Sequence, residues 1–348
     1  IISLIKSMPL IISTFRDSMK SMKGGSASGT SRTEKDLPMP FILGGILLII
    51  LIIWLAPAIP VSPLGALLIV IFGFFFSTVS ARMVGMIGSS NNPVSGMTIA
   101  TLLIATMILK ATGNVGIEGM IGSMAIASVI CICAAIAADT SQDLKTGYLL
   151  GATPVKQQIG ELIGVIAAGL AIGGVLYLLD SAWGYGGAEV PAPQATLMKM
   201  IVEGIMGGNL PWTLVFAGAF IGIVVEVLGI PVLPFAVGLY LPIHLSTPMM
   251  IGGLVRLFLE KKKGMDEKAK KDMIDNGVLY CSGLIAGEGL VGILLAVFAI
   301  IPMADGSLGD FLGTIISGTP INSNIGGLVF FALLTATLFK VTIGRKKK

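Results

Sequence analysis

A run of small polar residues separates two strongly apolar segments between Gly88 and Met97. Its asparagines carry hydrogen-bond donors and acceptors, and its proline and glycine disfavour a continuous helix. Irregular backbone at membrane depth is tolerated where it lines protein or a water-filled cavity, and free backbone groups there can hold a substrate or ion. We expect the run to line a translocation path, through Asn91, Asn92, Pro93, Ser95 and Gly96. The alternative is an ordinary turn, since the same residue types form turns.

Two carboxylates follow the end of another apolar segment. Asp139 and Asp143 are four residues apart, so a helical turn would place both on one face. Facing carboxylates disfavour double ionisation, so one of them can hold a proton near neutral pH. The pair is therefore a candidate for proton coupling, and a solvated cytoplasmic loop with ion pairs is the alternative.

Ionisable residues also lie within or at the ends of apolar segments, at Lys110, Glu118, Glu161, Glu226 and Glu288. Such residues usually face a bundle interior or a water path. Glu288 is the deepest, and an isolated charge there would cost roughly 2.5–3.5 kcal/mol or more. Because desolvation favours the protonated acid, we expect Glu288 to carry a proton or orient a substrate. Snorkelling, helix capping or a neutral hydrogen bond between helices are the alternatives.

The segment 230–259 contains four prolines, which remove backbone donors and break or kink helices. We expect two short half-helices around a break near Pro242–Pro248, in a re-entrant hairpin, and one long kinked span is the alternative. Tyr240 and His244 fall at this break and are candidate path residues. Histidine changes charge close to neutral pH, which suits such a place.

The composition requires lipid as the solvent for most of the chain. Of its 348 residues 54% are hydrophobic and 12% charged, whereas a soluble domain carries about 25% charged residues. A spanning helix needs about 20 mainly apolar residues, which predicts an all-α, polytopic transmembrane bundle of about eight spans besides 230–259. The expected spans are roughly 41–59, 62–84, 97–113, 117–138, 158–180, 210–229, 277–302 and 321–341.

Other classes of function find no support in the residues. The chain has no Walker A loop, no paired metal-ligand spacing and no nucleophile elbow. Its three cysteines lie in apolar runs and behave as small apolar residues. We therefore expect no enzyme activity, no metal, no cofactor and no nucleic-acid partner.

Basic residues predict the orientation in the membrane. Nineteen of the 23 Lys and Arg residues lie in 1–39, 139–157, 260–276 and 340–348. By the positive-inside rule these segments and both termini are cytoplasmic. We expect a cytoplasmic amphipathic or linker segment at 1–39 and a transmembrane domain at 40–348. Because the chain opens without Met inside an apolar stretch, it is expected to be part of a longer polypeptide.

Several strings in the same order resemble the oligopeptide transporter family, most closely its prokaryotic members. They are Asn91–Ile99, Asp139–Gly147 with Ala152–Pro154, Phe235–Pro242, Gly252–Arg256 and Gly283–Gly289. The resemblance extends, with gaps, from about residue 40 to 340 and matches the C-terminal half of the family.

The resemblance implies a polypeptide of about sixteen spans that carries peptides or metal–chelator complexes with protons across the cytoplasmic membrane. The N-terminal half of the same transporter would then be a partner, together with the lipid bilayer, and a homo-oligomer is compatible with the sequence. A non-transporting subunit or fragment is the alternative of another class.

Overall fold

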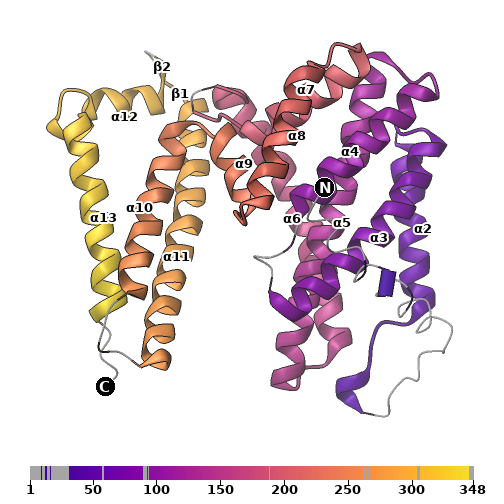
Figure 1. The fold of residues 1–348 in the computed structure, drawn as a ribbon, viewed down its shortest axis with the longest axis horizontal. Coiled ribbons are helices and arrows are strands. Elements are labelled where there is room, and N and C mark those ends of the chain that lie inside the picture. The colour runs from indigo at the N-terminus through magenta and orange to yellow at the C-terminus, as the bar shows by residue number, and fades with distance from the viewer. Residues whose placement is uncertain are drawn as a thin grey trace. The chain divides into compact units, whose positions relative to one another are not determined.

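The computed structural model describes most of the chain beyond residue 30. The described residues are Pro9, Ile12, Ser13, Arg16 and 31–344 without 57–58, 89–91, 93, 188, 262–263, 265 and 304–305. They are almost entirely helical and divide into two compact units (Figure 1). Unit 1 comprises Ile1–Gly169 with Gln194–Ala219, and unit 2 comprises Leu170–Pro193 with Phe220–Lys348.

The elements follow one another with short connections. In chain order they are η1 Arg32–Glu34, α2 Met39–Leu55, α3 Pro63–Ile87, α4 Val94–Ala111, α5 Gly116–Leu150, α6 Pro154–Trp183, α7 Pro193–Gly207, α8 Trp212–Val227, α9 Val232–Tyr240, α10 Ile243–Glu260, α11 Glu267–Ile300, β1 Pro302–Met303, β2 Gly306–Ser307, α12 Leu308–Ile316, η3 Pro320–Asn322 and α13 Asn324–Gly344.

The core of unit 1 is formed by α3, α4 and α5, which pack side by side (Figure 1). Phe76 of α3, Leu102 of α4 and Ile130 of α5 are at most 2% exposed in this core. Close packing there depends on small residues, since a Cβ at Gly122 of α5 would lie 2.7 Å from the Pro60 carbonyl oxygen. This three-helix core fixes the ends of the helices that carry the candidate site.

Helix α7 packs against the same core. Val202 and Met206 are buried in it, and the Lys110 ammonium at the end of α4 donates a 2.6 Å hydrogen bond to the Ile205 carbonyl. A cation at the C-terminal carbonyls of a helix is a favourable partner. Lys110, expected to be an intramembrane ionisable residue, therefore has a structural contact.

In unit 2, α11 packs against α10, α12 and α13. Val255, Leu259 and Met273 form its small buried core against Leu338 and Phe339. The β1–β2 hairpin follows α11 and leads directly into α12. Unit 2 buries little apolar side chain by itself.

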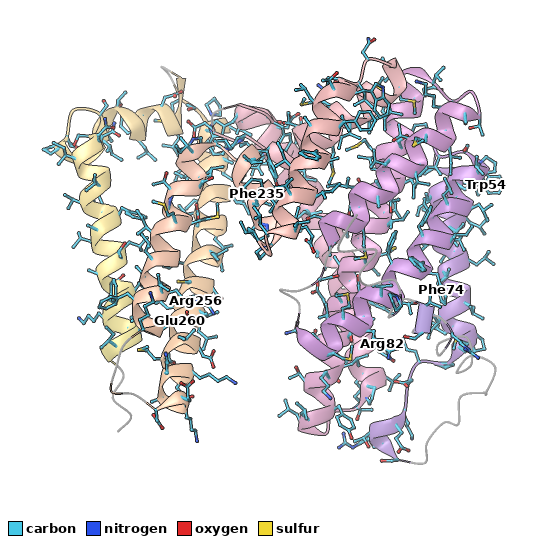
Figure 2. All side chains as sticks on the ribbon, viewed as in Figure 1. Trp54, Phe74, Arg82, Phe235, Arg256 and Glu260 are labelled. Carbon is cyan, nitrogen blue, oxygen red and sulfur yellow. The ribbon has the colours of Figure 1, made fainter. Side chains whose placement is uncertain are left out.

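Large apolar side chains remain exposed over most of the described helices (Figure 2). Neither α2 nor α6 contains a buried residue, and Trp54 of α2 is 46% exposed. A soluble protein rarely leaves such wide apolar faces uncovered. These faces are those expected of helices that contact lipid or other membrane helices.

The expected polytopic helical bundle is confirmed. Within the described residues seven helices are long and apolar enough to cross a membrane, and they match seven of the eight expected spans. The eighth, expected at 210–229, is α8, an apolar helix of 16 residues.

Two boundaries differ from expectation. Helix α5 continues past residue 138 to Leu150, and α11 begins at Glu267, inside the segment expected as a loop. In both helices polar residues extend an apolar run, after it in α5 and before it in α11, and hydropathy alone does not register them.

The segment 230–259 is discontinuous, as expected. Helix α9 ends at Tyr240, Leu241 and Pro242 are extended, and α10 begins at Ile243. Pro248 does not contribute to the break, contrary to expectation, and lies inside α10. It lies in the second turn, where its missing N–H leaves the His244 carbonyl without its intrahelical donor, but the helix continues through it.

Candidate functional site

The polar run between α3 and α4 is held by a buried hydroxyl. The Ser80 hydroxyl of α3 donates a 3.1 Å hydrogen bond to Asn92 Oδ1, and Ser80 is completely buried. Because this bond occupies the amide oxygen, the two N–H donors of Asn92 are directed away from Ser80. Asn91 and Pro93 lie outside the described residues.

The other candidates in this run belong to α4. Ser95 and Gly96 are half-buried in its first turn, directly after Val94 begins the helix. Gly96 was expected to interrupt the helix, but the helix continues through it. The described residues of the run from Val94 onward are therefore helical, contrary to expectation.

The second candidate motif meets the same end of α3. The Ser141 hydroxyl of α5 donates a 2.6 Å hydrogen bond to the Ala81 carbonyl. The contact is close because a Cβ at Gly85 would lie 2.7 Å from Ser141 Oγ. Asn92 and Ser141, far apart in the sequence, thus bond consecutive residues of α3. The structure brings the two motifs to one end of unit 1.

Helices α5 and α6 form a hairpin beyond this contact. Gly151 takes the left-handed conformation that ends α5, and α6 begins at Pro154. Thr140, Asp143 and Gly147 recur at helical spacing on α5, and each of them faces α6. Asp139, four residues before Asp143, is exposed.

The face of α6 opposite these residues carries Gln157 and Glu161. Gln157 Nε2 donates a 3.1 Å hydrogen bond to the Asp143 carbonyl, and its amide lies where a side chain at position 147 would project. The Glu161 carboxyl lies beside the Thr140 hydroxyl and the Asp143 carboxylate. The structure therefore places Glu161 within electrostatic reach of Asp143, whose side chain is exposed, across the hairpin.

A short segment before α2 is bonded to the tip of this hairpin. The Arg32 guanidinium donates to the Gly151 carbonyl at 2.9 Å and to Thr153 Oγ1 at 2.8 Å. The Val155 amide donates to the Lys35 carbonyl at 3.0 Å, and the Leu37 amide to Gln158 Oε1 at 2.9 Å. Residues 31–37 thus anchor the hairpin from outside the bundle.

The remaining candidates lie in unit 2. Tyr240 ends α9 and His244 lies exposed in the first turn of α10, so both flank the break at Leu241–Pro242. Glu288 lies near the middle of α11 and is exposed, and a Cβ added at Gly287 or Gly289 would meet no atom of another described element within 4 Å. Glu288 thus faces away from the packed core of its unit.

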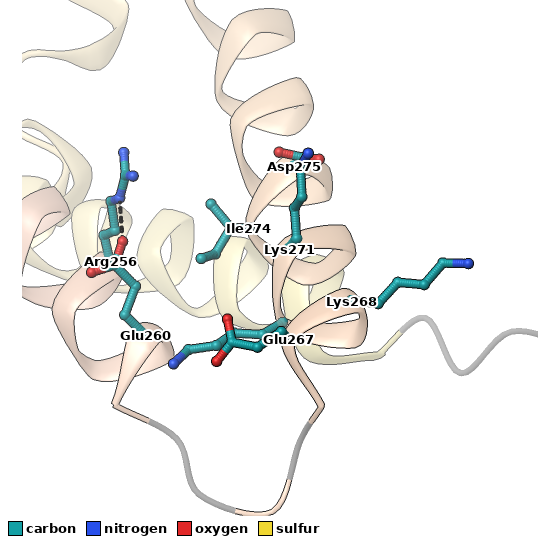
Figure 3. Close-up of a pocket in the computed structure, with 8 residues that line it drawn as sticks. Arg256, Glu260, Glu267, Lys268, Lys271, Ile274 and Asp275 are labelled. Carbon is teal, nitrogen blue, oxygen red and sulfur yellow. Dashed lines mark hydrogen bonds and ion pairs between the residues drawn. The ribbon is translucent and has the colours of Figure 1, made fainter.

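A charged groove of about 750 Å³ lies where α10 ends and α11 begins (Figure 3). Arg256 Nε donates to Glu260 Oε1 at 2.8 Å, one turn apart on α10. Lys268, Lys270 and Lys271 of α11 line the other side. These are basic residues on which the expected cytoplasmic position of 260–276 rests.

Three residues of this site were not singled out from the sequence. Ser80, Ser141 and Gln157 are ordinary polar residues of helices, and only tertiary contacts distinguish them. Glu161 was recognised as ionisable within an apolar segment, but its neighbours on α5 were not. Among the described residues, no three His, Cys, Asp or Glu side chains gather closely enough to hold a metal ion.

The chain matches a known protein family and several known proteins over much of its length. Residues 2–299 match the family described as OPT oligopeptide transporter protein. A Haemophilus influenzae protein named as an oligopeptide transporter is 33% identical over 327 residues, covering 80% of this chain and 51% of the relative. A Saccharomyces cerevisiae protein named as oligopeptide transporter YGL114W is 28% identical over 278 residues, covering 74% of this chain and 37% of its own.

A third relative is named for a different cargo. The Oryza sativa protein named as metal-nicotianamine transporter YSL10 is 27% identical over 217 residues, covering 57% of this chain and 31% of its own. The chain thus spans about half the length of the Haemophilus influenzae relative and less of the other two. No solved structure matches it.

Proposed function

Because the chain belongs to the OPT oligopeptide transporter family, we propose that it forms the C-terminal half of a proton-coupled symporter for oligopeptides. The observation that carries the proposal is the family match over residues 2–299, which includes both polar motifs at the end of α3. The chain is a multi-pass membrane protein, and a transporter of this family moves its cargo without chemical change.

The proposed translocation path includes the polar run between α3 and α4. The amide donors of Asn92, which have no partner among the described residues, suit the carbonyl and carboxylate oxygens of a peptide. Asn91, Pro93, Ser95 and Gly96 belong to the proposed path with it. In unit 2 the proposed path includes Tyr240 and His244, which flank the break between α9 and α10, and Glu288 of α11.

Glu288 of unit 2 is the proposed proton carrier, and Asp139 and Asp143 of unit 1 are further candidates. Its exposure on an apolar helix supports this role, since a carboxyl group in that position needs a partner outside the described chain or a proton. The N-terminal half of the same transporter is the proposed partner that would cover this face.

The proposed location is the cytoplasmic membrane with both termini and residues 260–276 in the cytoplasm. The basic side chains around the groove of Figure 3 support this orientation. A cysteine placed at Lys268 in the intact transporter should react with an impermeant reagent only from the cytoplasmic side. Labelling only from outside would reverse the proposed orientation.

Metal chelates are the second candidate cargo, because relatives such as YSL10 are named for metal-nicotianamine transport. The two cargoes are separated by an uptake assay with the intact transporter in proteoliposomes. Labelled di- to pentapeptides and iron or zinc chelates would be offered in parallel under one acid gradient. We expect uptake of peptides, whereas uptake of chelates alone would establish the second candidate, and uptake of neither would favour a non-transporting subunit.

A further inference from the structure

Two buried oxygen atoms on one face of α6 lack a hydrogen-bond donor. They are Gln157 Oε1 and Glu161 Oε1, and within the described part of the chain neither has a partner. Residues four apart on a helix are neighbours on its surface. A buried acceptor without a donor is costly, so the pair requires an explanation.

The orientation of the Gln157 amide does not remove the problem. Its nitrogen donates to the Asp143 carbonyl, and exchanging nitrogen and oxygen would place two acceptors against each other. Space is also restricted, because the amide occupies the place of a side chain at Gly147. Gln157 therefore presents its oxygen as an acceptor that needs a proton from a neighbour.

The surroundings of Glu161 do not favour its ionised form. On α5 it faces the Thr140 hydroxyl and the Asp143 carboxylate, and among the described residues no basic side chain forms an ion pair with it. Lys145 lies over the Tyr148 ring, 5.8 Å from its centroid, and Lys156 is exposed.

The anchoring segment 31–37 does not supply a counter-ion either among the described contacts, and its Lys35 is exposed. Arg32 is bonded to Gly151 and Thr153, and Asp36 Oδ1 accepts from Gln158 Nε2 at 3.4 Å. An ionised Glu161 would add a second negative charge near Asp143, and its buried oxygen and that of Gln157, one helical turn away, would both remain without a donor. One added proton removes both conflicts.

We infer that Glu161 carries a proton in this conformation and releases it during transport. The Glu161 carboxyl group donates that proton toward Gln157 Oε1, while the Thr140 hydroxyl is available to the second carboxyl oxygen. On release the O–H bond breaks, water accepts the proton, and the carboxylate remains. Glu161 is seven residues into α6, about 10 Å along the helix from the α5–α6 turn. This inference rests on the proposed symport, in which the turn faces the cytoplasm.

The test compares Glu161→Gln with a matched control in the intact transporter. Glutamine keeps the shape of the protonated acid but cannot titrate, so proton-driven uptake should fall about tenfold, a typical coupling effect. Peptide exchange without a gradient should stay close to wild type, and the pH dependence of uptake should flatten. Glu118→Gln alters an exposed carboxylate in the first turn of α5 and should change neither readout.

Infrared spectroscopy of the purified transporter decides the protonation directly. The difference spectrum of wild type minus Glu161→Gln at neutral pH should contain a carboxylic-acid C=O band, whether or not the variant transports, because protonated carboxyl groups elsewhere cancel in the difference. A difference spectrum without this band, or proton-driven uptake of Glu161→Gln with wild-type pH dependence, overturns the inference. Absence of peptide exchange in the wild type would instead reject the proposed function, and the infrared result would still stand.

Discussion

Replacing Gly85 by alanine should destabilise unit 1 at the contact that joins the two candidate motifs. The new Cβ would lie 2.7 Å from Ser141 Oγ, which is itself held by its 2.6 Å bond to the Ala81 carbonyl. Overpacking of this kind costs about 1–3 kcal/mol, and loss of the hydrogen bond about 0.5–1.5 kcal/mol. The better helix propensity of alanine offsets about 1 kcal/mol.

Gly73 of the same helix provides the matched control. A Cβ there meets no atom within 4 Å, so Gly73→Ala gains the helix propensity without the overlap. The two variants should therefore differ in stability by roughly 1.5–4.5 kcal/mol. Thermal unfolding in detergent, followed by tryptophan fluorescence at one scan rate, should place Gly85→Ala several degrees below Gly73→Ala.

A double variant separates the overlap from other causes. Ser141→Ala removes the hydroxyl that Gly85→Ala would displace, so Gly85→Ala with Ser141→Ala should be more stable than additivity of the two single changes predicts. If Gly85→Ala unfolds at or above the temperature of Gly73→Ala, or the two changes simply add, the described α3–α5 contact is wrong.

Three further predictions concern the path, the proton and the fold. Asn92→Ala should reduce transport severalfold with normal expression, because the amide donors positioned by Ser80 are lost, and wild-type uptake would return the run to an ordinary turn. Glu288→Gln should lose proton-driven uptake but retain substrate exchange, and normal pH-dependent uptake would exclude Glu288 as a proton carrier. The Ser307 hydroxyl and amide both donate hydrogen bonds to the Asp310 carboxylate and thereby lower the pKa of Asp310. The ionised Asp310 therefore stabilises the fold above the usual carboxyl pKa, and this stabilisation is lost as the pH falls through the lowered pKa. Asp310→Asn should thus lower the melting temperature at neutral pH and not in strong acid, and an equal difference at both would refute the role of its charge.

The helical architecture could be predicted from the sequence because a bilayer imposes a length of about 20 apolar residues. Helix ends were less predictable. Asp139–Leu150 continues α5 because its Gln, Leu and Lys are good helix formers, although hydropathy ends the apolar run before it. Four prolines predicted the break before α10, but their pattern did not show that Pro248 lies within a helix.

The sequence singled out the polar and acidic residues of the candidate site but not the residues that contact them. Asn92, Asp143 and Glu161 have residue types that attract attention in an apolar chain. Their partners Ser80 and Gln157 do not, because serine and glutamine are common in helices and only the tertiary contacts of these two residues connect them with the site. Nothing in the local spacing relates Ser141 to Ala81, which lies on another helix.

The most direct test of the central claim is peptide uptake by the intact transporter in proteoliposomes, with and without an inward acid gradient. We predict that labelled peptide accumulates when the gradient is present and that a protonophore returns uptake to the rate of passive equilibration. Accumulation that is unchanged by the protonophore, or no entry of peptide under either condition, would contradict proton-coupled peptide transport.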